Sequence, residues 1–470
     1  MGTEATGVIV GRWAWTFAFA AFSLVGSAAD DFGTPALAQV QRSGEPSEVS
    51  QPNLTGDWGG VRSYLERHGI TFTLNYTNDF LANVHGGIKT GAVGIGVFQP
   101  ALDIDLEKLV GWEGGKFHTH GLVTHGPFFS STYLGNILAV SNLEAGPVAR
   151  LYSLWYEQSA FNDLLSVRAG LMSGDSQFLQ SKTASNFINN GISWPTFLAG
   201  NLPAGGPAYP LPDPGIRVRF KPADDVSFQA AVFSGDPSGG NGSNQGEPIP
   251  TGTVFSFRGG AFFIAEASYE PNQGKDAKGL PGAYRIGAWY HTSPRFGDQR
   301  FDNTGRSLAD PLSTGIPLNH TGDFGIYGVV DQMLYRVPGT DDQGLSAFVR
   351  VGGAPNDRNL INFYADGGLM YKGLIPRRPD DKIGLAFLYA RVGNNARGLN
   401  VDTGQFGNFF FPVRSAETVF ELMYQAQLTP WWTVQPEMQY IIRPGGGVLN
   451  SDGSLRPNAW VTLLRSTINF

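Results

Sequence analysis

The chain has 470 residues, no cysteine, 63 glycines and a formal net charge of −7, with 13% aromatic and only 16% charged residues. The lack of cysteine excludes a disulfide-stapled scaffold, and the aromatic content excludes a disordered chain. The acidic balance argues against a nucleic-acid partner. Beyond the N-terminus no stretch approaches the roughly 20 apolar residues of a spanning helix. The composition therefore favours an exported or membrane-associated all-β protein.

The N-terminus predicts an export signal. Residues 13–29 form an apolar block directly after Arg12, and small-residue cleavage sites lie at Ala29 and at Ala38. We therefore predict a signal peptide over 1–38, with the exact cleavage site open between these two positions. A membrane anchor or a buried strand is the alternative interpretation of the same block.

A linker and one short helix are predicted next, over 39–69. Residues 39–53 are polar, and 54–69 show helical spacing, with Val61 and Leu65 on one face and Asp57 near the N-cap position. Because a strand pattern starts directly after residue 69, we expect this helix to lie on the periplasmic side of the strands.

From Ile70 onward the hydrophobic period changes to two. A clear case is Ile216, Val218 and Phe220, which alternate with Arg217 and Arg219. Long segments with one apolar and one charged face are typical of a transmembrane barrel, in which lipid lies outside and water inside. The pattern predicts a barrel domain over 70–470 in the outer membrane of a Gram-negative bacterium, with its apolar face against the lipid.

We count about 16 such segments, an even number typical of porin-sized barrels. The expected starts are residues 70, 98, 115, 148, 163, 214, 226, 259, 282, 323, 344, 360, 382, 416, 431 and 459. Tight polar turns alternate with long Gly/Pro/Asn-rich loops at 173–213, 235–258, 293–322 and 394–415. The last segment ends on Phe470, and a terminal aromatic on a final strand predicts recognition by the barrel-assembly machinery.

Seven segments, in the right order over nearly the whole mature chain, resemble the carbohydrate-selective porin family (OprB-type). They are 54–87, which contains LTGDWGGVR, 101–117, 133–158, 168–195, 208–220, 330–336 and 434–446. The resemblance implies an all-β, 16-stranded antiparallel barrel with inward-folded loops. It also implies passive uptake of glucose and similar mono- and small oligosaccharides. Ser153 departs from the family, which commonly has an acidic residue there, so the preferred sugar stays open.

The predicted strand phase places a set of charged and aromatic side chains in the lumen. Sugars have polar hydroxyl rims and apolar faces, so a selective pore should offer charged hydrogen-bonding groups and aromatic rings. We expect a charged pair between Glu157 and Arg168 at the constriction, with Asp103, Asp105 and Glu266 as an acidic wall. The other expected lining residues are Trp155, Arg217, Arg219, Arg285 and Trp289. The plainer alternative is that these groups hold a loop or screen a neighbouring carboxylate.

The segment 173–195 is the expected constriction loop. It combines amide and acidic groups with aromatic rings, a composition that suits sugars but also suits a loop that packs on itself. The residues expected to narrow the pore are Asp175, Gln177, Phe178, Asn186, Phe187, Asn189 and Trp194.

Other chemistries have little support in the sequence. His118 and His120 are spaced to share a strand face, but no further ligands accompany them at a fixed spacing, and no nucleotide-binding motif is present. We expect no metal, no cofactor and no enzyme activity. Two alternatives remain open: a porin for another small polar or anionic solute, to which the arginines are suited, and an exported β-rich enzyme acting on polysaccharide.

Overall fold

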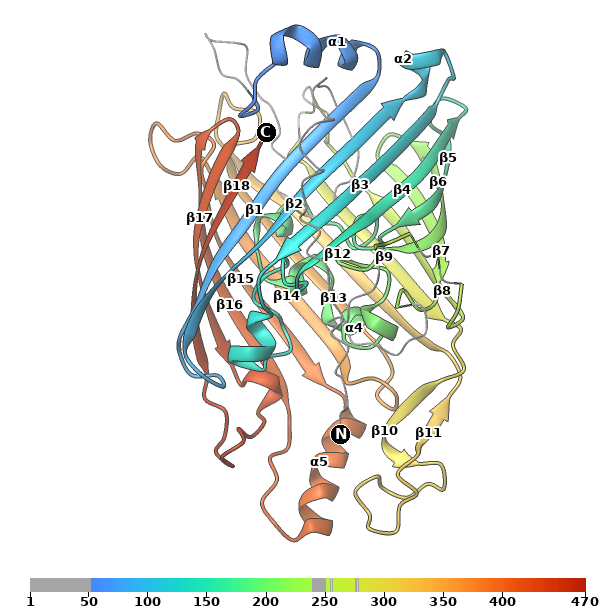
Figure 1. Cartoon of the computed structure of the whole chain (residues 1–470), viewed down its shortest axis with the longest axis vertical. Coiled ribbons are helices and arrows are strands. Elements are labelled where there is room, and N and C mark those ends of the chain that lie inside the picture. Colours follow the sequence, from blue (N-terminus) through green and yellow to red (C-terminus); the bar gives the residue numbers. More distant parts are fainter. Residues whose placement is uncertain (1–51, 239–250, 254, 256, 275–276, 278) are drawn as a thin grey trace, which may run out of the picture.

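The computed structural model describes residues 52–238, 251–253, 255, 257–274, 277 and 279–470. The predicted export signal over 1–38 and most of the predicted linker lie outside the described residues. The remaining chain forms one closed barrel (Figure 1).

Sixteen antiparallel strands make the barrel, as predicted. In order around the ring they are β1, β18, β17, β16, β15, β14, β13, β12, β9, β8, β7, β6, β5, β4, β3 and β2, which pairs with β1 again. Their bounds are β1 Ile70–His85, β2 Gly91–Asp105, β3 Gly115–His125, β4 Val148–Ala160, β5 Leu165–Met172, β6 Asp213–Ala223, β7 Val226–Ser234, β8 Ala261–Tyr269, β9 Gly282–His291, β12 Asp323–Arg336, β13 Gly344–Gly353, β14 Ile361–Lys372, β15 Lys382–Val392, β16 Ala416–Thr429, β17 Trp432–Ile442 and β18 Ala459–Asn469.

Alternation along each strand separates an apolar outer surface from a polar interior. On β6, Ile216 is 49% exposed and Val218 42%, whereas Arg217 between them is 3% exposed. A lipid-facing arginine near the middle of a membrane costs about 2–4 kcal/mol, so the inward phase of the arginine is the stable one. The period-two pattern therefore fixes which side chains can line the lumen.

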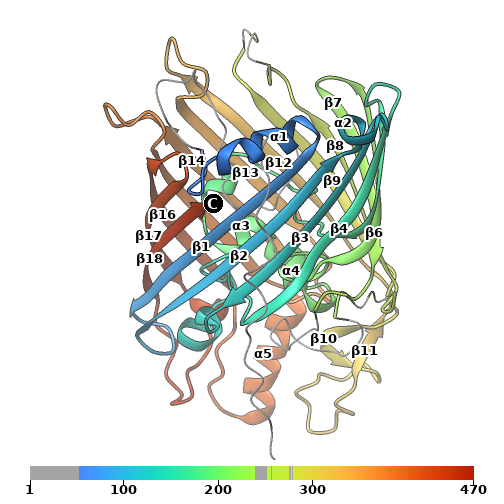
Figure 2. The same cartoon turned by 45° about the horizontal axis from the view of Figure 1, so that its top comes forward.

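The two ends of the barrel differ in the length of their connections. At one end the strands are joined by 106–114, 161–164, 224–225, 270–281, 337–343, 373–381 and 430–431. At the other end the connections are 86–90, 126–147, 173–212, 235–260, 292–322, 354–360, 393–415 and 443–458. Short turns mark the periplasmic end of such barrels and long loops the extracellular end. Figure 2 shows α1 and α2 at the short-turn end and α5, β10 and β11 at the other.

Strand β2 begins earlier than the sequence indicated. We expected a strand from residue 98, but β2 starts at Gly91, and Gly91 to Val97 pair with Asn83 to Thr77 of β1. The segment GAVGIGV carries few of the large outward side chains that reveal a strand, which is why its first half was missed.

The two ends of the described chain meet at a seam on the short-turn end. The 3₁₀ turn η1 (Trp58–Gly60) and helix α1 (Val61–Arg67) precede β1, as the predicted short helix does. Arg62 is buried, lies 4.6 Å from the centre of the Trp58 ring, and donates from Nη2 to the Phe470 oxygen at 2.8 Å. Phe470 in turn donates its N–H to the Leu74 oxygen of β1 at 2.9 Å.

Two loops fold into the barrel. Loop 126–147 contains the π-helical turn η2 (Ser130–Leu134), and loop 173–212, called the inward loop below, contains four short helical turns. These turns are η3 (Ala184–Asn186), α3 (Asn190–Ser193), α4 (Thr196–Ala199) and η4 (Pro203–Gly205). Their apolar side chains form a buried core with the barrel wall.

The remaining elements lie at the ends of the barrel. Helix α2 (Leu106–Val110) caps the β2–β3 turn, and η5 (Pro444–Gly446) comes after β17. The strands β10 (Phe296–Asp302) and β11 (Pro317–His320) pair with each other, and α5 (Asn394–Gly407) packs beside β10. In the part of the chain that the structure describes, no helix is long and apolar enough to cross a membrane.

Candidate functional site

Three charged side chains predicted to line the lumen meet on neighbouring strands. Glu157 of β4 pairs in register with Arg168 of β5, which pairs with Arg217 of β6. Glu157 Oε2 accepts from Arg168 Nε at 2.5 Å and from Arg217 Nη2 at 2.6 Å. All three residues are 3–6% exposed, so one carboxylate balances two buried guanidinium groups.

Trp155 is enclosed on both faces of its ring. The His118 ring of β3 stacks on it with centroids 4.8 Å apart and planes at 17°, and the Arg168 guanidinium lies 3.7 Å from its centroid. The two partners come from the strands on either side of β4, so they cover opposite faces. His118 Nδ1 lies 2.5 Å from Asp103 Oδ1. Asp103, through His118, and Trp155 therefore contact the group formed by Glu157, Arg168 and Arg217. Both faces of the Trp155 ring are covered, so no aromatic face is open to a sugar there.

Arg219 is the partly exposed member of this group. It comes after Arg217 on the inward face of β6, opposite Gln229 of β7. Its guanidinium makes no hydrogen bond or ion pair with any residue that the structure describes, and its buried Nε has no partner. We call Arg168, Arg217 and Arg219 the arginine ladder.

Arg285 joins the barrel wall to the inward loop. Its Nη2 lies 2.6 Å from Glu270 Oε1, and its Nη1 donates to the Gln180 oxygen at 2.9 Å. Glu266 lies 3.8 Å from Arg285 and accepts the Leu179 N–H at 3.0 Å. Glu266 is thus placed inside the barrel as expected, but its oxygens accept from the loop and from Gln229 and Tyr327 of the wall.

Two predicted lining residues lie apart from this group. Asp105 caps helix α2, since its Oδ1 accepts the N–H groups of Glu107 and Lys108 at 3.1 Å each. It therefore stands at the short-turn rim and not in an acidic wall. Trp289 is 3% exposed and packs on Phe262 with ring centroids 6.1 Å apart, near the long-loop end of β9.

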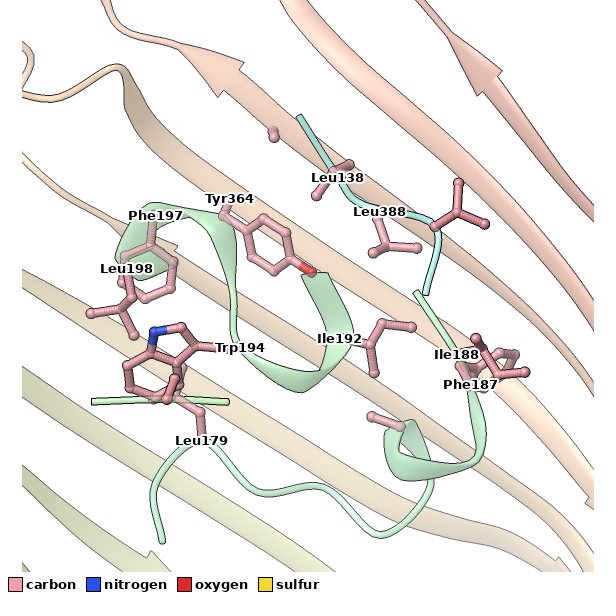
Figure 3. Close-up of a cluster of buried hydrophobic side chains, with 14 of the residues drawn as sticks. Leu138, Leu179, Phe187, Ile188, Ile192, Trp194, Phe197, Leu198, Tyr364 and Leu388 are labelled. Carbon is pink, nitrogen blue, oxygen red and sulfur yellow. The ribbon is translucent and has the colours of Figure 1, made fainter. Parts of the chain in front are cut away.

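The aromatic residues of the inward loop form its core and do not face the lumen. Phe178, Phe187 and Trp194 are at most 3% exposed. Figure 3 shows Trp194 and Phe187 among loop and barrel side chains, with Tyr364 and Leu388 contributed by the wall. Trp194 Nε1 donates to the Gly205 oxygen of the same loop at 2.9 Å. These rings stabilise the loop by burial, which is the self-packing alternative raised by its composition.

The polar residues of the loop divide into buried and partly exposed groups. Asn189 is fully buried and donates to Gln439 Oε1 of β17 at 3.0 Å. Asp175 is buried, and this burial raises its pKa, although the Tyr209 N–H that it accepts at 2.9 Å acts in the opposite direction. Gln177 and Asn186 are partly exposed, and the Gln177 amide nitrogen donates to Ser176 of the same loop.

Carboxylates of the barrel wall hold the inward loop in place. Glu421 of β16 accepts the Ile188 N–H at 2.6 Å and the Asn189 N–H at 3.2 Å. Asp331 of β12 accepts from Ser181 Oγ at 2.6 Å, Thr183 N at 2.7 Å and Thr183 Oγ1 at 2.6 Å. Sequence reasoning missed both anchors. An inward carboxylate with no basic residue opposite it in register on either adjacent strand is the signal that could have found them.

Loop 126–147 is held in the same way. Glu417 of β16 accepts the N–H groups of Ile137 and Leu138 at 2.8 and 2.7 Å. Ser141 Oγ donates to Asp79 Oδ2 of β1 at 2.6 Å. The two loops also bond to each other, for example through Asn142 N to the Ile188 oxygen at 2.9 Å. This loop was not among the long loops expected from the sequence.

Two lysines near the inward loop were also not predicted from the sequence. Lys182 is exposed on the inward loop, and Lys382 is the first, inward residue of β15. Asn186 links them, because its Oδ1 accepts from Lys382 Nζ at 2.7 Å and its Nδ2 donates to the Lys182 oxygen at 2.9 Å. Neither lysine forms an ion pair with a described carboxylate.

A small polar cavity lies between the arginine ladder and the inward loop. It measures about 20 Å³, the space of one or two waters. Tyr152 Oη and Ser153 Oγ line it and have no hydrogen-bond partner among the described residues, and His120, Arg168 and Gln177 lie beside them. The cavity can therefore hold ordered water against the wall, but it is too small for a sugar ring.

Known proteins resemble this chain over most of its length. The family model "Carbohydrate-selective porin, OprB family" matches residues 89–470. Porin B of Pseudomonas aeruginosa is 29% identical over 432 residues, which cover 85% of this chain and 89% of the relative. A putative porin, QuiX, of Acinetobacter baylyi is 24% identical over 438 residues, covering 89% of this chain and 93% of the relative.

Solved structures show the same likeness. The high-pH structure of Pseudomonas putida OprB has a TM-score of 0.79 and 26% identity, and the match covers 90% of this chain and all of the other. The low-pH structure of that protein matches the same share of both chains with a TM-score of 0.54 at 21% identity. The similarity therefore extends over almost the whole described barrel.

Proposed function

Because this chain belongs to the OprB family of carbohydrate-selective porins and is an outer-membrane sugar channel, we propose that it takes up glucose-like monosaccharides and small oligosaccharides by passive diffusion. The solutes move through the space between the barrel wall and the inward loop. The observation that supports this route best is the fixed position of the loop, which Asp331 of β12 and Glu421 of β16 hold at two places four strands apart in the ring. A fixed loop gives a constriction of constant size, which is what sorting solutes by size and polarity needs.

The residues proposed to touch the solute are those that solvent can reach. They are Arg219 and Arg285 on the wall and Gln177 and Asn186 on the loop. Guanidinium and amide groups together offer both donors and acceptors to sugar hydroxyls. The buried residues that were expected to line the pore support it without contacting the solute. Glu157, Arg168 and Trp155 stabilise the wall, and Phe178, Phe187 and Trp194 stabilise the loop.

Export and assembly complete the proposal. Residues 1–38 act as a signal peptide, 39–69 as a linker and short periplasmic helix, and 70–470 as the barrel. The apolar outer face of the barrel contacts outer-membrane lipid. The assembly machinery recognises the last strand, which ends on Phe470, and the alternating exposure along β18 supports this.

Planar-bilayer conductance with a glucose titration tests the proposed function. We expect single-channel current in KCl to fall in a saturable manner as glucose is added, because bound sugar occupies the constriction. Arg285→Gln should weaken this block several-fold, since it removes a wall cation and its bond to the loop. Arg295→Gln, at an exposed position of a long loop, is the matched control and should leave the block unchanged. A glucose-insensitive wild-type current would contradict the proposal.

A further inference from the structure

The charges inside the barrel divide sharply by exposure. Apart from Asp105 at the rim, every carboxylate on a described barrel strand is buried, with 0–8% exposed surface. These residues are Asp79, Asp103, Glu157, Asp213, Glu266, Asp323, Asp331, Asp366, Glu417, Glu421 and Glu437. Those that hold loops or balance a buried arginine have their oxygens turned toward protein groups.

The partly exposed charges on the inward faces are cations. Arg219 on β6 and Lys382 on β15 are partly exposed, and Lys182 on the inward loop is exposed. Within the described residues none of the three forms an ion pair, and Lys382 bonds only to the amide oxygen of Asn186. A solute in this part of the lumen therefore meets uncompensated positive charge.

These cations lie on nearly opposite sides of the passage. β6 and β15 are seven strands apart in the ring of sixteen, and Lys182 lies on the inward loop four residues before Asn186, which bonds to Lys382 of β15. Positive charge on both sides of a water-filled constriction attracts an anion along its whole width, and low-dielectric walls strengthen the effect. The arginine guanidinium is also suited to bind a carboxylate through two parallel hydrogen bonds.

We propose that this channel prefers monosaccharides that carry a carboxylate, such as aldonic or uronic acids, over neutral sugars of the same size. This inference rests on the proposed function, since it names the substrate class of the same passage. The carboxylate pairs with Arg219 on one wall or with Lys182 and Lys382 on the other, while the hydroxyls donate to the amide oxygens of Gln177 and Gln229.

Efflux of labelled gluconate and glucose from proteoliposomes that contain the purified full-length chain tests this proposal. In low salt we expect gluconate to leave about three-fold faster than glucose, the gain that a unit charge several ångströms from one or two cations gives in water. The triple variant Arg219→Gln/Lys182→Gln/Lys382→Gln should lose this preference, so that gluconate leaves no faster than glucose from the same liposomes. Lys221→Gln, on the same face of β6 but beside Asp224 at the rim, is the matched control and should keep the preference.

A second readout covers the case in which the triple variant does not fold. The wild-type gluconate-to-glucose ratio should fall toward one as salt rises from about 10 mM to 1 M, because the Debye length shrinks from about 30 Å to 3 Å. A wild-type ratio at or below one in low salt would overturn the charge preference alone. A channel that passes neither solute would instead contradict the proposed function.

Discussion

At the residue scale, the role of an inward side chain depends on which of its hydrogen-bonding groups and ring faces are already occupied by side chains of the adjacent strands. Trp155 and Arg168 were expected to meet the solute because both point inward. The register places His118 and Arg168 over the two faces of Trp155, and Glu157 on Arg168. Their charge and aromaticity therefore stabilise the wall itself, and Arg219 at the end of this group is the partly exposed arginine whose guanidinium has no partner among the described residues.

Glu157 is the residue whose replacement should affect this cluster most. Glu157→Gln leaves Arg168 and Arg217 buried side by side without a counter-charge, which typically costs about 3 kcal/mol of unfolding free energy. We expect the urea midpoint of the reconstituted barrel to fall accordingly. Glu113→Gln, in the exposed β2–β3 turn, serves as the control and should leave the midpoint unchanged. An unchanged midpoint in Glu157→Gln would show that water in the lumen replaces the carboxylate without loss.

Strand phase, but not contact, could be derived from the sequence at this scale. Alternation places Arg217 inside and Val218 outside correctly, because a wrong phase would put charge into lipid. The partners of Trp289 or Asp105 depend instead on strand register and on helix capping. The alternation of apolar and polar residues along the sequence does not reveal the strand register or the helix caps.

At the scale of elements, the barrel and its inward loops are joined by hydrogen bonds from wall carboxylates to loop backbone. Glu417 and Glu421 each accept loop N–H groups, so one strand, β16, fixes both loops. A backbone N–H that is buried without a partner costs about 1–3 kcal/mol, which explains why carboxylates occupy such buried positions. The sequence predicted that segment 173–195 forms the constriction loop, but it did not predict which wall residues hold this loop.

Releasing this attachment should widen the channel. Glu421→Ala removes the acceptor of two buried N–H groups, and we expect the loop around Ile188 to detach from β16. The single-channel conductance should then rise about two-fold and the glucose block should weaken. Leu422→Ala, whose side chain faces lipid on the same strand, should change neither quantity. Equal conductance in both variants would contradict the anchoring role.

At the scale of the whole molecule, the ring closes where the two ends of the chain meet. β1 and β18 pair from Asn75 opposite Asn469 to His85 opposite Trp460. Arg62 in α1 adds a bond from outside the sheet, to the last residue. Leu54 and Arg62 of the segment LTGDWGGVR, which carries part of the family resemblance, thus both bond to the end of the last strand.

Loss of this bond should weaken closure. Arg62 is buried against Trp58 and Phe470, so Arg62→Ala removes both a stacking partner and a hydrogen bond to the terminal residue. We expect the temperature at which the folded, fast-migrating band disappears on a gel to fall by several degrees. Arg67→Ala, an exposed position on the same helix, is the control. Identical transition temperatures in the two variants would argue against a role in closure.

The number and order of strands could be predicted from the sequence because a barrel repeats one rule sixteen times. Alternation and turn chemistry recur in every strand, so errors in one segment, as at the start of β2, do not spread to the others. The interior has no such repeat. Each loop contact, such as Asp331 with Thr183, is made once between segments far apart in the chain.

Because the two ends of the chain meet at the seam, the same ring of strands could be encoded with a different strand as the first one in the gene. The Leu54 N–H donates to the Asn469 oxygen at 2.8 Å, so the two ends of the barrel chain are already adjacent. A short peptide joining them, with new ends opened at the turn 224–225, would keep every strand pair in place. A circularly permuted gene would thus encode the same pore, with β7 as its first strand and β6 as its last.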